Sequence, residues 1–103
     1  MTGTAHVDTF ARDRQPPRDQ WPELVFDLPE LRYPERMNCA SELLGGAIAR
    51  GQGDRVAIRS TDGLSWTYRE LEARANRIAQ LLVDDLGVVP GNRVLLRGPN
   101  SPM

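Results

Sequence analysis

The clearest pattern along the chain is a pair of amphipathic segments. The first runs from Asn38 to Gly51, where apolar residues recur at the i, i+3, i+4, i+7 and i+8 spacing of one helix face. This face consists of Ala40, Leu43, Leu44, Ala47 and Ile48. Asn38 is a suitable N-cap and Gly51 a suitable residue at which the helix ends. The pattern therefore predicts a helix that begins after Asn38.

The second amphipathic segment begins at Thr67. Thr67-Tyr68-Arg69-Glu70 has the form of a capping box, and Trp66 and Leu71 flank it as a hydrophobic staple. The apolar face that follows consists of Leu71, Ala75, Ile78, Ala79, Leu82 and Leu86. Glu70 stands four residues before Arg74, which predicts a favourable exposed pair. We expect this longer helix to end at Gly87.

Short apolar runs surround the second helix. Residues 55–59 are typical of a strand, Thr61-Asp62-Gly63 of a tight turn, and residues 64–66 of the return strand of a hairpin. Residues 93–97 are apolar between two arginines, as in a strand buried on both faces of an α/β sheet. Ser101-Pro102 has the form of a helix start, yet the sequence stops at Met103, so we expect a segment of a longer protein.

The first part of the chain lacks such periodicity. Residues 1–20 are polar and predict a flexible leader. Residues 21–37 mix large apolar side chains with three prolines, which predicts an extended proline-rich arm held by those side chains on another surface. Residues 38–103 would then be the start of a domain that is incomplete.

Composition excludes several classes of function. The 103 residues suffice for one small domain at most, and 13 basic against 14 acidic residues give no support for nucleic-acid binding. No apolar run has the length of a secretory signal or a membrane span, and the one cysteine favours a reducing compartment, hence the cytoplasm. All 13 basic residues are arginine, which excludes lysine chemistry within this chain.

Few side chains are candidates for chemistry. Cys39 lies in the first turn of a predicted helix, where a thiol can become nucleophilic, but the only histidine, His6, lies in the leader and offers no positioned base. We therefore interpret Cys39 as a small buried apolar residue, and His6, which has no plausible metal partners, receives no role.

Three other features have a functional and a structural interpretation. The loop 97–101 follows a predicted strand and could bind an anion, although most such loops are simple connections. Trp66 and Tyr68 could stack on a base or an aromatic acid, but their place around the capping box favours packing. The helix arginines are interleaved with acids, as on a solvated face: Arg69, Arg74 and Arg77. We predict no catalytic, cofactor-binding or metal-binding residue in this chain.

Five short segments, in order, give the chain a recognisable resemblance. They are residues 38–44, 53–58, 66–71, 75–79 and 87–94. From about Trp21 onward the chain resembles the beginning of the acyl-adenylate-forming superfamily, which includes AMP-forming acyl-CoA synthetases. Residues 26–34 and 91–103 look most like aromatic-acid CoA ligases of the benzoate and 2-aminobenzoate type. Asn92 stands where many members have aspartate, at a turn position that either side chain can serve.

The resemblance implies an α/β fold, the partial N-terminal lobe of the large domain of these enzymes, with a helix, a β-hairpin, a long helix and a core strand. It also implies ATP, Mg²⁺ and CoA as cofactors of the full-length enzyme, and a small carboxylic acid as its substrate. The resemblance to benzoate and 2-aminobenzoate CoA ligases implies that this acid is aromatic. The phosphate loop, the nucleotide and magnesium segment, the ribose aspartate and the adenylation lysine of the superfamily have no counterpart in this sequence. The fragment itself is thus expected to be inactive.

A function of another class is also compatible with the sequence. The chain could be a stand-alone interaction module that retains this lobe and docks to a partner through an uncovered sheet. If the chain is instead an incomplete segment, it leaves apolar surface without cover in isolation, and we expect it to be poorly folded or to self-associate.

Overall fold

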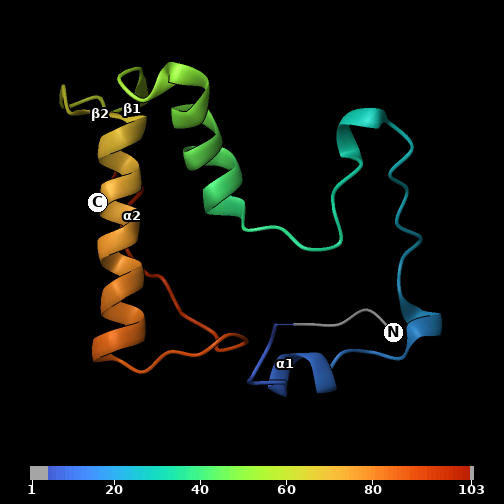
Figure 1. Ribbon diagram of the computed structural model, residues 1–103. Coiled ribbons are helices and arrows are strands. Elements are labelled where there is room, and N and C mark those ends of the chain that lie inside the picture. The colour runs from blue at the N-terminus through green and yellow to red at the C-terminus, as the bar shows by residue number, and fades with distance from the viewer. Residues whose placement is uncertain (1–4, 103) are drawn as a thin grey trace. The chain divides into compact units, whose positions relative to one another are not determined.

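The computed structural model describes residues 5–102, which divide into two compact units. The hairpin–helix unit comprises residues 38–88 and 94–102, and the leader unit comprises residues 5–37 and 89–93. Figure 1 shows the elements of both units along the chain. The two units are described in turn.

The first helix of the hairpin–helix unit begins after Asn38, as predicted. The Asn38 side-chain Oδ1 accepts a hydrogen bond from the Ser41 amide at 3.1 Å, which is the geometry of an N-cap. Two segments of the helix have the wider π-helical turn, η3 (Ser41–Gly45) and η4 (Ile48–Gln52). Gly51 has a φ of +78°, the left-handed conformation expected of the glycine that ends a helix.

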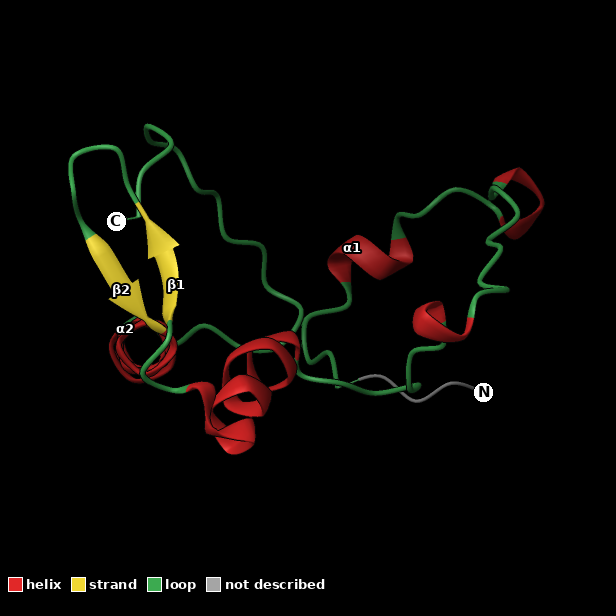
Figure 2. Ribbon diagram, turned by 90° about the horizontal axis from the view of Figure 1, so that it is seen from above, coloured by secondary structure: helices red, strands yellow, loops and turns green. Residues whose placement is uncertain are grey.

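An antiparallel hairpin follows, formed by β1 (Val56–Arg59) and β2 (Ser65–Thr67) (Figure 2). Ile58 is paired with Trp66, and an irregularity in the register falls between Val56 and Ile58. In the turn, the Leu64 amide donates to Asp62 Oδ1 at 3.1 Å, and Gly63 has a φ of +88°. The predicted Asp-Gly turn is confirmed, because its glycine adopts the conformation that other residues avoid.

The long helix α2 (Tyr68–Gln80) starts at the predicted capping box. The Glu70 amide donates to Thr67 Oγ1 at 3.2 Å, and the Thr67 amide donates to the Glu70 carboxylate at 2.8 Å. The helix continues as the π-helical segment η5 (Leu81–Asp85) and reaches Gly87, which has a φ of +63°. Both predicted ends of this helix are therefore confirmed.

Residues 53–55 connect the first helix to the start of α2. The Arg69 amide donates to the Gly53 carbonyl and the Tyr68 amide to the Arg55 carbonyl, each at 3.0 Å. The Arg69 guanidinium lies so close to buried Gly53 that a Cβ there would stand 2.5 Å from its Nη2. Glycine thus lets the arginine lie across the backbone, where it also bonds Asp54 at 3.4 Å.

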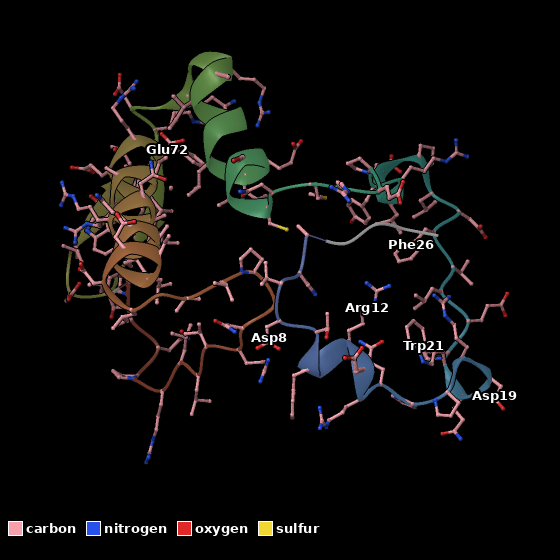
Figure 3. The ribbon with its side chains drawn as sticks, turned by 60° about the horizontal axis from the view of Figure 1, so that its bottom comes forward. Asp8, Arg12, Asp19, Trp21, Phe26 and Glu72 are labelled. Carbon is pink, nitrogen blue, oxygen red and sulfur yellow. The ribbon has the colours of Figure 1, made fainter. Side chains whose placement is uncertain are left out.

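The interior of the described chain is very small. Among residues 5–102 only Ala47, at 2% exposure, and Trp66, at 7%, are buried apolar side chains. The first helix lies close to α2 at Gly45 of η3, where a Cβ would be in ordinary van der Waals contact, 3.5 Å from the carboxylate of Glu72, which is labelled in Figure 3. The architecture is that of a partial α/β lobe, with two helices and a hairpin.

The predicted strand over residues 93–97 does not form. These residues belong to no helix or strand, and Leu95 and Leu96 are 91% and 90% exposed. A strand of this type needs neighbours on its edges and helices on its faces, and the described chain brings neither to it. The prediction of a buried strand over residues 93–97 is therefore wrong for the described residues.

The leader unit consists of short helical turns joined by extended chain. These are α1 (Phe10–Asp13), η1 (Arg18–Gln20) and η2 (Pro29–Leu31). The arm is extended apart from η2, and Phe26 and Tyr33 meet edge to face with ring centroids 6.1 Å apart. Its large apolar side chains stay exposed, so the predicted support on another surface is not found among the described residues.

Candidate functional site

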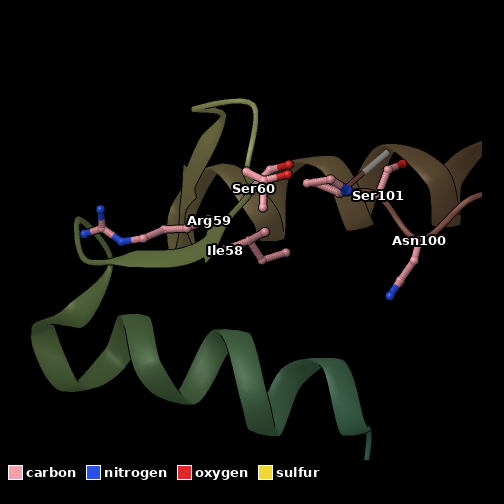
Figure 4. A pocket seen from close by; sticks show the side chains of 7 residues that line it. Ile58, Arg59, Ser60, Asn100 and Ser101 are labelled. Carbon is pink, nitrogen blue, oxygen red and sulfur yellow. The ribbon is translucent and has the colours of Figure 1, made fainter.

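A polar pocket of about 350 Å³ lies between the hairpin and the last described residues. It is lined by residues 58–61 of the hairpin and residues 100–102 (Figure 4). The structure thus brings part of the predicted loop, Asn100 and Ser101, next to Ser60. Figure 4 shows the Arg59 side chain directed away from Asn100 and Ser101.

The chemistry of this pocket follows from its lining. Hydroxyl and amide groups can bind water or a neutral polar group, whereas an anion needs a cation or several converging amides. The Arg59 guanidinium, which could supply the charge, points elsewhere. The geometry therefore favours the structural interpretation of the loop 97–101, and its anion-binding role remains untested.

A second, apolar groove of about 450 Å³ lies along one face of α2. Its lining residues are Trp66, Leu71, Arg74, Ala75, Arg77, Ile78 and Pro102. The predicted staple residues, Trp66 and Leu71, both belong to it, while Tyr68 is not among them. Trp66 is thus largely buried at the base of α2, in agreement with a packing role.

Arg74 has a place that the sequence did not reveal. Its guanidinium carbon lies 4.1 Å from the centre of the Trp66 ring, within the range of a cation–π contact. The predicted Glu70–Arg74 attraction contributes only the last of the effects that lower the pKa of Glu70. Arg74 lies eight positions after Trp66, which is on the preceding strand. No regular spacing in the sequence predicts such a contact, so sequence analysis missed it.

Two carboxylates of this unit have pKa values below their ordinary range. The pKa of Glu70 is lowered first by the hydrogen bond from the Thr67 amide, and that of Asp62 by the bond from the Leu64 amide, with help from the Ser60 side chain. Backbone donors stabilise the ionised form in both cases. Each carboxylate therefore serves its turn or helix cap, and neither is poised to donate a proton.

Comparison with known proteins places the chain in a family. The model of the AMP-binding enzyme family matches residues 47–103, which is more than half of the chain. This chain belongs to the AMP-binding enzyme family. The match covers the end of the first helix, the hairpin and α2.

The chain is also similar in sequence to parts of longer enzymes. It is 38% identical over 68 residues to benzoate–CoA ligase of Thauera aromatica, covering 66% of this chain and 13% of the relative. It is 38% identical over 73 residues to 3-hydroxybenzoate–CoA/4-hydroxybenzoate–CoA ligase of the same organism, covering 71% and 14%. Surfactin synthase subunit 1 of Bacillus subtilis is 48% identical over 56 residues, covering 53% and 2%. No solved structure matches the chain.

The superfamily that this chain resembles binds a nucleotide and its metal ion through clustered ligands. Phosphates need converging backbone amides or cations, and Mg²⁺ needs carboxylate ligands. Within residues 5–102 there is no group of three or more His, Cys, Asp or Glu side chains that could hold a metal ion. The chain contains no lysine. No catalytic step is assigned to its side chains.

Two candidate side chains from the sequence remain to be placed, Cys39 and His6. Cys39 is exposed, so its interpretation as a buried apolar residue is wrong. The other described elements of the hairpin–helix unit leave the first turn of its helix exposed. His6 is also exposed, in the leader unit. A search of the described residues finds no helix with the length and apolar character needed to cross a membrane.

Proposed function

We propose that this chain is a scaffold segment of an ATP-dependent aromatic-acid CoA ligase. Such an enzyme joins a carboxylic acid to the α-phosphate of ATP, releasing pyrophosphate, and CoA thiol then displaces AMP to give a thioester. The observation that carries the proposal is the similarity to two CoA ligases named for benzoate and hydroxybenzoates, over 66% and 71% of the chain. The chain spans only 13% and 14% of those relatives.

The scaffold role rests on what the described residues do. Thr67 and Glu70 fix the start of α2, and Gly53 lets Arg69 tie the first helix to it. These contacts support a structural role for the residues that make them. We accordingly expect the cofactors and the acid to be bound by parts of the enzyme beyond this chain.

A direct assay tests the expected inactivity. The purified chain should show no carboxylate-dependent ATP–pyrophosphate exchange with benzoate, 2-aminobenzoate or a hydroxybenzoate. Loss of one positioned electrostatic contact commonly lowers a rate by about 10²- to 10³-fold, and here the complete set is missing. Exchange above the level without acid would refute the inactivity of the chain, although not its family.

Sequencing the gene beyond the Met103 codon tests the parent activity. An open frame that enters a Ser/Thr/Gly-rich loop would support the ligase, and the enzyme it encodes should form thioesters from aromatic acids and not from long aliphatic ones. A stop codon at that point would favour the interaction module. The exposure of Leu95 and Leu96 is the observation that favours that second function, since a partner could cover them.

A further inference from the structure

The leader unit contains a contact between two segments that are distant in sequence. Asp8 lies near the start of the described chain and is labelled in Figure 3, and it meets the turn formed by residues 89–93. The amides of Val7 and Asp8 both donate to the Pro90 carbonyl, at 2.8 and 2.9 Å. Two backbone bonds therefore hold the leader against the turn before any side chain is considered.

The Asp8 carboxylate adds three hydrogen bonds. Its Oδ1 accepts from the Phe10 amide at 2.9 Å, which fixes the side chain on its own segment. Its Oδ2 accepts from Asn92 Nδ2 and from Arg93 Nη1, each at 2.7 Å. The pKa of Asp8 lies below its ordinary range, first because of the Phe10 amide and then because of Asn92. A carboxylate with this set of donors is held in one orientation.

Asn92 is the residue that distinguishes this contact from an ordinary turn. Its Oδ1 accepts from the Val89 amide at 2.9 Å, a duty that aspartate could also perform. Its Nδ2 donates to Asp8, and this is a duty that aspartate cannot perform, because two carboxylates would then face each other. The expectation that either side chain can serve at position 92 holds for the turn alone.

The neighbouring residues are shaped for the same contact. Gly91 has a φ of +95°, and a Cβ there would collide with the backbone of Asp8. The Arg93 guanidinium carbon lies 4.6 Å from the centre of the Phe10 ring, so it is in contact with the leader through the ring as well as through Asp8. Glycine, asparagine and arginine in succession thus each make a distinct contribution.

We propose that residues 7–10 form a clasp that docks specifically on the turn 89–93, and that Asn92 selects it. The clasp joins a segment that precedes the family match to a segment within it. On this proposal residues 7–10 are an ordered part of the leader unit, whereas the sequence predicts a flexible leader over residues 1–20. Asparagine at position 92 would then mark chains of this family that have the clasp, whereas aspartate there would mark chains that have only the turn.

Residue-resolved hydrogen exchange on the whole 103-residue chain tests the clasp. The amides at positions 7 and 8 report docking, because their acceptor is the Pro90 carbonyl. Asn92→Asp keeps the acceptor for Val89 but sets a carboxylate against Asp8, and Asp8→Ala removes the anchor. Each variant should speed exchange at these two amides about tenfold, as expected for loss of a charge-assisted hydrogen bond. Asp19→Ala, which removes an exposed acid of the same unit, is the matched control and should leave exchange unchanged.

The double variant makes the test specific. If Asn92 acts through Asp8, then Asn92→Asp should have no further effect in the Asp8→Ala background, because the two substitutions remove one interaction. Equal effects of Asn92→Asp in both backgrounds would show that it disturbs the turn alone and would overturn the proposal. Unprotected amides at positions 7 and 8 in the unaltered chain would also overturn it.

Discussion

The substitution Thr67→Ala tests how much the Thr67 hydroxyl stabilises the start of α2. The Thr67 hydroxyl accepts from the Glu70 amide at 3.2 Å and donates to the Glu70 carboxylate at 3.1 Å. Alanine removes both bonds and leaves the Glu70 amide without its side-chain acceptor. The bond from the Thr67 amide to Glu70 at 2.8 Å belongs to the backbone and can persist.

The expected magnitude follows from the position of these bonds. They lie at the surface, so water can replace the lost acceptor in part, and cap substitutions of this kind destabilise a helix by about 1 kcal/mol. This is equivalent to about a fivefold change in a local opening equilibrium. The amides of Tyr68 and Arg69 donate to the carbonyls of Arg55 and Gly53, and these bonds do not depend on the Thr67 hydroxyl. We therefore expect the effect to be confined to the first turn of α2, while the middle of the helix remains closed.

Hydrogen exchange at single amides measures this effect without assuming cooperative unfolding. The Glu70 amide should exchange about fivefold faster in Thr67→Ala. Thr67→Ser keeps the oxygen and should behave as the unaltered chain, and Ser65→Ala controls for a small change on the neighbouring strand. If Thr67→Ala and Thr67→Ser protect the Glu70 amide equally, the hydroxyl does not cap the helix and the reasoning is refuted.

Three further predictions concern other parts of the chain. The pKa of Glu70 is lower in the fold than in the unfolded chain, so its ionised form adds stability that is present above its ordinary pKa and is lost as the pH falls through the lowered value. Protection of the amides at the start of α2 from hydrogen exchange should therefore fall as the solution is made acidic. An equal fall in Glu70→Gln would contradict this. Gly91→Ala should undock residues 7 and 8, since its φ is positive and the space is occupied, whereas Gly98→Ala meets nothing within 4 Å and should be silent in the same exchange measurement. The isolated chain should show a broad thermal transition, bind a hydrophobic dye and sediment in a concentration-dependent manner, because its interior consists of little more than Ala47 and Trp66; a sharp transition of a monomer would contradict the picture of an incomplete lobe.

The features that the sequence predicted correctly depend on neighbours along the chain. The capping box, the Asp-Gly turn, the Asn38 cap and the glycines that end the helices are each decided by a few consecutive residues. Local chemistry of this kind needs no knowledge of what lies elsewhere. The π-helical segments could not be predicted in this way, because the 3.6-residue pattern of apolar positions is unchanged by one wider turn.

The features that the sequence predicted wrongly depend on distant parts of the fold. Residues 93–97 have the composition of a buried strand, but burial requires elements that the described chain does not bring to them. Cys39 was assigned to an interior for the same reason. Asn92 was recognised as a turn residue, whereas its second partner, Asp8, is separated from it by 84 positions and gives no periodic signal.

The sequence separations of these contacts have a consequence for the order of folding. The contact between Arg69 and Asp54 spans 15 residues, and the hairpin and the helix cap are more local still, whereas the bond between Asp8 and Asn92 spans 84. Short closures cost less chain entropy and form faster than long ones. On a ribosome, the hairpin and the start of α2 can assemble while the turn at residues 89–93 is still unmade. Asp8 must wait for that turn to emerge, so its contact with Asn92 can form only after the hairpin and the start of α2 have been synthesised.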